Sequence, residues 1–213
     1  ASTVVLQNGK RLPADVVVMG LGVRPEVWLA KEAGLRLREL GGIDVDEHLR
    51  TSDPDIYAVG DAVEVKFIPT GEKALLPLAG PANRQGRTAA DNIFGMSSTF
   101  DGVIGTAVLR LFDLSAACTG ANEKVLKKAG TAYQSIHLHP PSHAGYYPGA
   151  QPIAMKVLFN PDNGKLLGAQ CVGKDGVDKR IDVFATALKM GADVDDLAEM
   201  ELAYAPPFGS AKD

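Results

Sequence analysis

Two short apolar runs that end directly in glycine constrain this chain more than any other feature. Residues 15–19 run into Gly20-x-Gly22, and residues 56–59 run into Gly60-Asp61. Such runs predict strands buried on both faces of a sheet. Ligands of open α/β sheets bind beyond the carboxyl ends of the strands. Glycine lets a ligand approach the backbone, and the Asp61 carboxylate can accept hydrogen bonds from polyol hydroxyls. Alone, the pattern also fits an aspartate that only shapes a loop.

The first half of the chain predicts an α/β arrangement around these runs. Asn8-Gly9 indicates a hairpin turn after a short strand. Pro81 suits the first turn of a helix and Gly95 its end. The predicted elements are strands at 3–6, 15–19, 43–45 and 56–59 and helices at 26–33 and 80–94.

The second half, from about Gly102, has a different pattern. Strands and helices follow one another in an order typical of an α+β domain with an antiparallel sheet and helices on one face. The predicted elements are strands at 106–112, 132–138, 152–159 and 165–172 and helices at 122–129, from 177 to a cap at Gly191, and from about 193. We therefore predict two domains, residues 1–102 and 103–213.

Charge and hydropathy exclude several classes of function. The chain has 22 basic and 26 acidic residues, a net charge of −4, and no basic stripe, so nucleic acid is not an expected partner. No apolar stretch reaches the about 18 residues that a membrane span needs. The start lacks the pattern of a signal peptide. We expect a cytoplasmic protein, and both chain ends look cut.

The histidines and cysteines do not form a predicted reactive site. His137, His139 and His143 lie close in the sequence, but no nearby carboxylate or thiolate completes a metal site, so no metal is expected. Cys118 and Cys171 are far apart and lie in small or apolar surroundings. Both are expected to be core thiols in a reducing compartment rather than nucleophiles.

Three segments, in order and at fitting spacings, resemble the FAD-dependent pyridine nucleotide–disulfide oxidoreductases. They are Gly20-x-Gly22-x-x-Pro25, the segment Thr51-x₅-Tyr57-Ala58-x-Gly60-Asp61, and Leu78-Ala79-Gly80-Pro81-Ala82-Asn83-Arg84-Gln85-Gly86-Arg87. From about Gly105 the resemblance continues into the dimerisation domain of that family. It implies a C-terminal part of such an enzyme: the tail of the FAD-binding region followed by the dimerisation domain.

The resemblance assigns cofactor-binding roles to four residues. In the family, the aspartate after Gly60 holds a ribitol hydroxyl of FAD, which here is Asp61. The helix that starts after Leu78 and Ala79 aims its N-terminus at the flavin, where free N–H groups and a partial positive charge stabilise negative charge. No G-x-G-x-x-G follows a strand. We therefore expect the pyrophosphate sites for FAD and NAD(P)H, and the nucleophilic cysteine, to be absent from this chain.

The C-terminal segment favours one branch of the family. Disulfide reductases with a cysteine pair end in a His-Pro, but residues 201–210 contain no histidine. The segment instead resembles the single-cysteine branch of coenzyme A disulfide reductase, CoA persulfide reductase and NADH oxidase. In the CoA-linked members, tyrosines reach across a homodimer to the partner's flavin and sulfur. Tyr146 and Tyr204 are the candidates, ahead of Tyr147; packing at an interface is the alternative for Tyr146 and Tyr147.

The resemblance also predicts the substrate. Coenzyme A carries phosphates, and Asn83 and Lys212 are the expected contacts, unless both are only solvated. The intact protein is expected to pass electrons from NAD(P)H through FAD and a cysteine to a CoA-linked disulfide or persulfide, while this piece alone is inactive. A related NADH oxidase or peroxidase, or a cofactor-free dimerisation module, remains an alternative. The homodimer is expected to form through residues 103–213.

Overall fold

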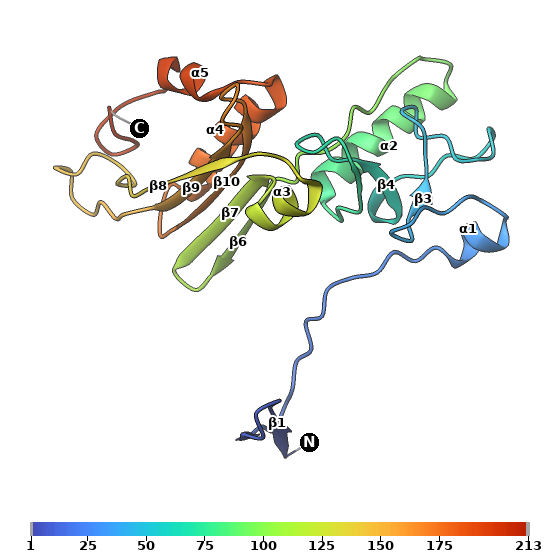
Figure 1. Cartoon of the computed structure of the whole chain (residues 1–213), viewed down its shortest axis with the longest axis horizontal. Coiled ribbons are helices and arrows are strands. Elements are labelled where there is room, and N and C mark those ends of the chain that lie inside the picture. Colours follow the sequence, from blue (N-terminus) through green and yellow to red (C-terminus); the bar gives the residue numbers. More distant parts are fainter. Residues whose placement is uncertain (1, 212–213) are drawn as a thin grey trace.

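The computed structural model describes residues 2–211, and its N-terminal part is a hairpin on an extended segment (Figure 1). Strand β1 (Thr3–Val5) pairs antiparallel with β2 (Arg11–Pro13), and Gly9 in the turn has φ +81°. The predicted hairpin at Asn8-Gly9 is therefore confirmed. Residues 14–27 then run without a helix or strand to α1 (Trp28–Glu32).

The predicted buried strand at residues 15–19 is wrong. Val16 is 80% and Val18 89% exposed, and no other described residue pairs with this segment. A strand needs a neighbour that accepts and donates its backbone hydrogen bonds. An apolar run cannot supply that neighbour by itself.

The predicted strand at residues 56–59 is also wrong, although its turn is in the right place. Tyr57 makes only an isolated bridge with Arg50. Gly60–Ala62 forms the 3₁₀ turn η1, and the strand follows it as β4 (Val63–Lys66). Strand β4 lies between the parallel β3 (Ile43–Asp44) and the antiparallel β5 (Lys73–Ala74).

Helix α2 (Ala79–Ile93) matches its prediction closely. Pro81, which cannot donate a backbone hydrogen bond, lies in its first turn, and Gly95 follows its end with φ +84°. Its buried residues recur every three or four positions, which is one face of a helix: Gln85, Thr88, Ala89 and Asn92.

The second half is the predicted α+β arrangement. Its five-stranded antiparallel sheet has the order β6-β7-β10-β9-β8. The elements are β6 (Ala107–Leu111), β7 (Leu114–Gly120), α3 (Glu123–Ala129), β8 (Gln134–Leu138), β9 (Ala154–Phe159), β10 (Leu166–Gly173), α4 (Val177–Met190) and α5 (Val194–Glu199). Strand β7 was not predicted, because its small residues lack a clear alternation.

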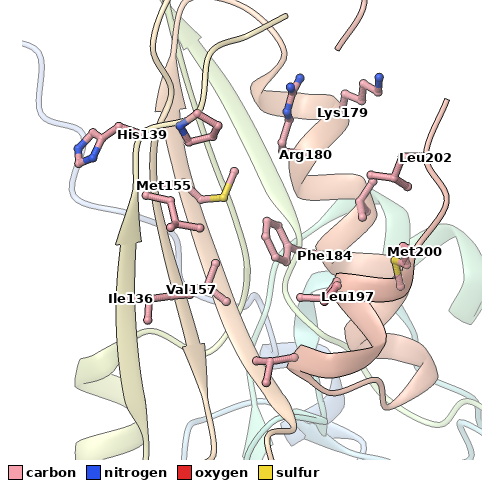
Figure 2. A pocket seen from close by; sticks show the side chains of 15 residues that line it. Ile136, His139, Met155, Val157, Lys179, Arg180, Phe184, Leu197, Met200 and Leu202 are labelled. Carbon is pink, nitrogen blue, oxygen red and sulfur yellow. The ribbon is translucent and has the colours of Figure 1, made fainter. Parts of the chain in front are cut away.

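One face of this sheet is covered by α4 and α5. Figure 2 shows Phe184 of α4 turned toward Met155 and Val157 of β9. The buried cluster between them also holds Ala169 and Cys171 of β10. These residues alternate along their strands, so burial of one face explains the pattern.

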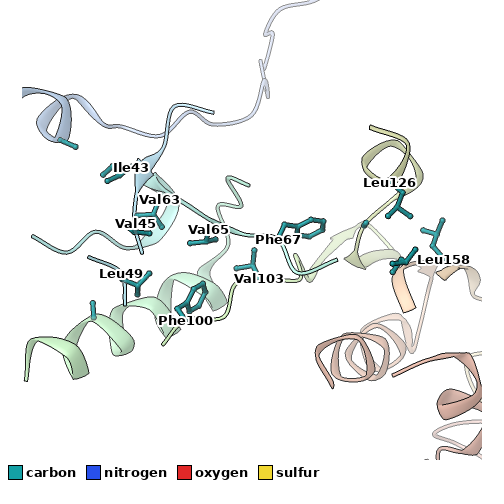
Figure 3. Close-up of a cluster of buried hydrophobic side chains, with 14 residues drawn as sticks. Ile43, Val45, Leu49, Val63, Val65, Phe67, Phe100, Val103, Leu126 and Leu158 are labelled. Atoms are coloured by element: carbon teal, nitrogen blue, oxygen red, sulfur yellow. The ribbon is translucent and has the colours of Figure 1, made fainter. Parts of the chain in front are cut away.

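A second cluster joins the two halves of the chain. Val65 of β4 belongs to this cluster together with Phe67 and Val103, and the cluster reaches Leu126 of α3 and Leu158 of β9 (Figure 3). Because this core is continuous, the division into domains at residue 102 stays a prediction. In the part of the chain that the structure describes, no helix combines the length and apolarity that a bilayer crossing requires.

Candidate functional site

The Gly60–Asp61 turn packs against α2. The backbone N–H of Gly60 donates to Oε1 of Gln85 at 2.6 Å, and Gln85 is only 2% exposed. Gly60 has φ +85°, a left-handed conformation that favours glycine. A Cβ added to Gly60 would meet no atom within 4 Å, so the space beside this backbone is open. The turn therefore presents accessible backbone beside the exposed side chain of Asp61.

The N-terminus of α2 carries free donors. Leu78 is the N-cap, and no side chain caps the helix. Among the described residues, no acceptor takes the N–H groups of Ala79 and Gly80. These groups and the helix dipole favour a negatively charged or carbonyl group here.

A cavity of about 390 Å³ opens at this helix start. Its walls come from both halves of the chain, with Leu78, Ala79 and Gly80 on one side and Gly105 and Thr106 on the other. Arg84 and Lys189 also line it. Lys189 is paired with Asp101 at 3.4 Å, so part of this positive charge is neutralised beside the cavity. Asn83 lies exposed on α2 beside Arg84, and Lys212 lies outside the described residues.

The two predicted tyrosines meet in the structure. The hydroxyl oxygens of Tyr146 and Tyr204 are 2.6 Å apart, although 58 positions separate them in the sequence. Both side chains are exposed. The loops that carry them are also joined by the Ala144 N–H, which donates to the Pro206 carbonyl at 3.2 Å. The hydrogen bond with Tyr146 raises the pKa of the Tyr204 phenol.

The structure does not bring all predicted site residues together. Helix α2 lies at one end of the molecule, whereas the loop after β8 and the chain's C-terminal tail lie at the other (Figure 1). Neither tyrosine lines the cavity at the start of α2, where Leu78 and Ala79 lie, so one chain does not bring these predicted residues together. Sequence reasoning missed Gln85 as a partner of Gly60; its place in the quoted helix motif was the available signal.

A larger cavity, of about 490 Å³, lies between the sheet and α4 and α5 (Figure 2). Its walls are mostly apolar and include Met155, Val157 and Phe184, with Lys179 and Arg180 at one end. His139, considered from the sequence as part of a metal site, also lines this cavity.

The other candidates considered from the sequence are histidines and cysteines of the second half of the chain. His137 and His139 are exposed on and just after β8. Among residues 2–211, no three histidine, cysteine or acidic side chains cluster as a metal site would require. Burial raises the pKa of the Cys171 thiol to about 11, which disfavours the reactive thiolate. Cys118 is half-buried and, like Cys171, is not in a disulfide.

Family models cover nearly the whole chain. The pyridine nucleotide-disulphide oxidoreductase model matches residues 1–93, and the model of that family's dimerisation domain matches residues 106–213. This chain belongs to the pyridine nucleotide-disulphide oxidoreductase family. The predicted family and fold class are thereby confirmed, and members of this family use FAD and NAD(P)H.

Characterised members of the family are clearly similar to the chain. Coenzyme A disulfide reductase of Staphylococcus epidermidis is 37% identical over 99% of this chain and 48% of that protein. An NADH oxidase of Methanocaldococcus jannaschii is 40% identical over 95% of this chain and 45% of that protein. The solved structure of reduced Bacillus anthracis CoADR-RHD is 51% identical, with a TM-score of 0.97, over 100% of this chain and 38% of that one. The chain thus spans about half the length of the curated relatives it matches.

Proposed function

We propose that the protein containing this chain passes electrons from NAD(P)H through FAD and a cysteine to a CoA-linked disulfide or persulfide. The observation that carries this proposal is the exposed Tyr146–Tyr204 pair, with its hydroxyl groups 2.6 Å apart. In such a pair one hydroxyl donates to the other, and the second hydroxyl is left to donate a hydrogen bond to a thiolate or a departing sulfur. The similarity to a coenzyme A disulfide reductase supports the same substrate class.

The residues of the Gly60–Asp61 turn and of the α2 N-terminus fit FAD. The Asp61 carboxylate is exposed and accepts no hydrogen bond or ion pair from another described residue, so it is available to ribitol hydroxyls. The free N–H groups of Ala79 and Gly80 suit the electron-rich edge of a flavin. When bound, FAD would supply the hydride acceptance and electron transfer that no protein side chain provides. The chain's own residues bind and orient it.

The tyrosines then serve the partner subunit of a homodimer. Within one chain they lie at the opposite end from α2 (Figure 1), so an intact site needs residues from two copies. We assign dimerisation to residues 103–213, consistent with the dimerisation-domain match. We assign the phosphates of coenzyme A to Asn83 and Lys212, and the relay cysteine to a residue outside this chain, since Cys171 is buried.

The test uses the full-length protein and three variants. Asp61→Asn should weaken FAD binding about tenfold, because it removes a charged acceptor from the cofactor site. Tyr204→Phe and Tyr146→Phe should keep FAD but lower turnover with CoA disulfide or CoA persulfide by about a hundredfold, within the range of one lost transition-state donor. A fully coloured Tyr204→Phe variant with wild-type turnover on these acceptors would contradict the proposal.

A second candidate function is NADH oxidation by oxygen, which the 40% identity to the Methanocaldococcus jannaschii NADH oxidase favours. Oxygen consumption and peroxide reduction, measured beside CoA disulfide reduction, separate the two. A higher kcat/KM with oxygen or peroxide would replace the CoA proposal. A colourless full-length dimer that takes up no added FAD would instead indicate a cofactor-free dimerisation module.

A further inference from the structure

We infer that Gln85 is a positioning residue that fixes the Gly60–Asp61 turn in the geometry that receives the cofactor. The inference rests on the proposed function, because it concerns the same FAD site. It goes beyond that function by assigning a task to a helix side chain that does not itself need to touch the cofactor.

The hydrogen bond defines how Gln85 is oriented. The Gly60 N–H can only donate, so the side chain of Gln85 must turn its oxygen toward the turn, and Oε1 lies 2.6 Å from that nitrogen. Gln85 is 2% exposed on the inner face of α2, among Thr88, Ala89 and Asn92. A buried amide on a rigid helix is therefore the anchor of an otherwise accessible loop.

The turn has few other restraints. Gly60 has no side chain to pack, and nothing lies within 4 Å of where a Cβ would be. The three-residue turn η1 is closed by the Val63 N–H, which donates to the Gly60 carbonyl. The Asp61 carboxylate has no partner among the described residues, so the backbone of the turn sets only where its Cα–Cβ bond points. Gln85 thus acts on Asp61 through Gly60.

The consequence for binding is preorganisation. A turn that is free to change φ must be ordered when a ligand binds, and that ordering lowers affinity. A turn already held in the left-handed conformation avoids this loss. Removing the acceptor on Gln85 should therefore weaken binding without removing any group that contacts FAD.

The experiment compares three variants of the full-length protein. Gln85→Met keeps the length of the side chain but removes the acceptor, Gln85→Asn is too short to reach Gly60, and Gln85→Glu retains an acceptor oxygen. Gln134→Met, at an exposed position at the start of β8, is the matched control. FAD dissociation constants are measured by titrating the apoprotein, and hydrogen exchange reports the Gly60 amide independently of activity.

We expect Gln85→Met and Gln85→Asn to raise the FAD dissociation constant about tenfold, equivalent to about 1.4 kcal/mol. The Gly60 amide should also exchange at least about tenfold faster in both, since its bond is lost. Gln85→Glu should stay within about threefold of wild type, and Gln134→Met should match wild type.

Three results would overturn the inference. One is an unprotected Gly60 amide in the wild-type apoprotein, which needs no variant and stays informative if Gln85→Met does not fold. Another is faster exchange with unchanged FAD affinity in Gln85→Met or Gln85→Asn. The third is an equal loss of affinity in Gln85→Glu. If Asp61→Asn leaves FAD affinity unchanged, the proposed cofactor site itself fails; if Asp61→Asn weakens binding and Gln85→Met does not, only this inference fails.

Discussion

Two separate loops bring the hydroxyl groups of Tyr146 and Tyr204 together, so Tyr146 affects the protonation of Tyr204. Each phenol is exposed, and water would otherwise satisfy it. The direct bond holds the proton on Tyr204 more firmly, which is why the pKa of Tyr204 lies above its ordinary value. The Tyr204 phenol therefore stays protonated up to a higher pH than an isolated tyrosine does.

Replacing Tyr146 by Phe should lower the pKa of Tyr204 toward its ordinary value of about 10. Because the folded-state pKa is raised, the pair's contribution to stability is present below about pH 10 and is lost as the pH rises through the pKa of Tyr204. The tyrosinate absorbance of Tyr204, isolated by subtracting the spectrum of the same protein with Tyr204→Phe added, should thus appear at lower pH in Tyr146→Phe.

Tyr147→Phe is the control for this titration, since it also removes one phenol but leaves the Tyr146–Tyr204 bond in place. Its Tyr204 titration should match wild type. Coincident Tyr204 titrations in wild type and Tyr146→Phe would show that the pair does not persist in solution.

At the scale of elements, close backbone contacts decide how the second sheet packs. Gly120 ends β7 with φ +69°. A Cβ there would lie 2.3 Å from the Leu167 carbonyl oxygen and 2.6 Å from Leu188 Cδ1. The position therefore needs glycine for two reasons, its left-handed conformation and the approach of β10 and α4.

Gly120→Ala should destabilise the fold by about 3 kcal/mol, because it combines backbone strain with a steric clash. Gly130→Ala is the matched control. Gly130 has φ +66° at the end of α3, but its added Cβ would meet nothing within 4 Å. It should lose only the strain, about 1 kcal/mol. Equal losses of unfolding free energy in urea would contradict the role assigned to the close contact.

At the scale of the whole molecule, the two parts of the candidate site lie in different halves of the chain. Helix α2 and the turn before β4 belong to the first half, whereas the loops that follow β8 and α5 lie on the side of the second half that faces away from it (Figure 1). The continuous core through Phe67 and Val103 joins the two halves. Under the proposed function, a second copy completes each site.

Mixed dimers test this arrangement. Asp61→Asn and Tyr204→Phe subunits, each impaired as a homodimer, are combined in a tagged heterodimer of the full-length protein. If Tyr204 serves the partner's flavin, the heterodimer has one intact site and should recover about half of wild-type turnover. If Tyr204 acted on its own chain, neither site would be intact and no recovery would be seen.

The sequence by itself determined the elements whose signals are local. Pro81 marks the start of α2 and Gly95 its end. Gly130 ends α3, and the turn at residues 161–164 joins β9 to β10. These follow from the backbone preferences of single residues, which tertiary contacts did not override. The family motifs likewise depend on residue identity at fixed spacings, and the family match confirmed them.

The tertiary structure alone decided which segments find partners. The apolar runs at 15–19 and 56–59 looked like buried strands, yet neither pairs with a neighbouring strand. The contacts of Gln85 with Gly60 and of Tyr146 with Tyr204 span 25 and 58 positions. Strand pairing and side-chain hydrogen bonds both need a remote group at the right place, and only the folded chain specifies where that group lies.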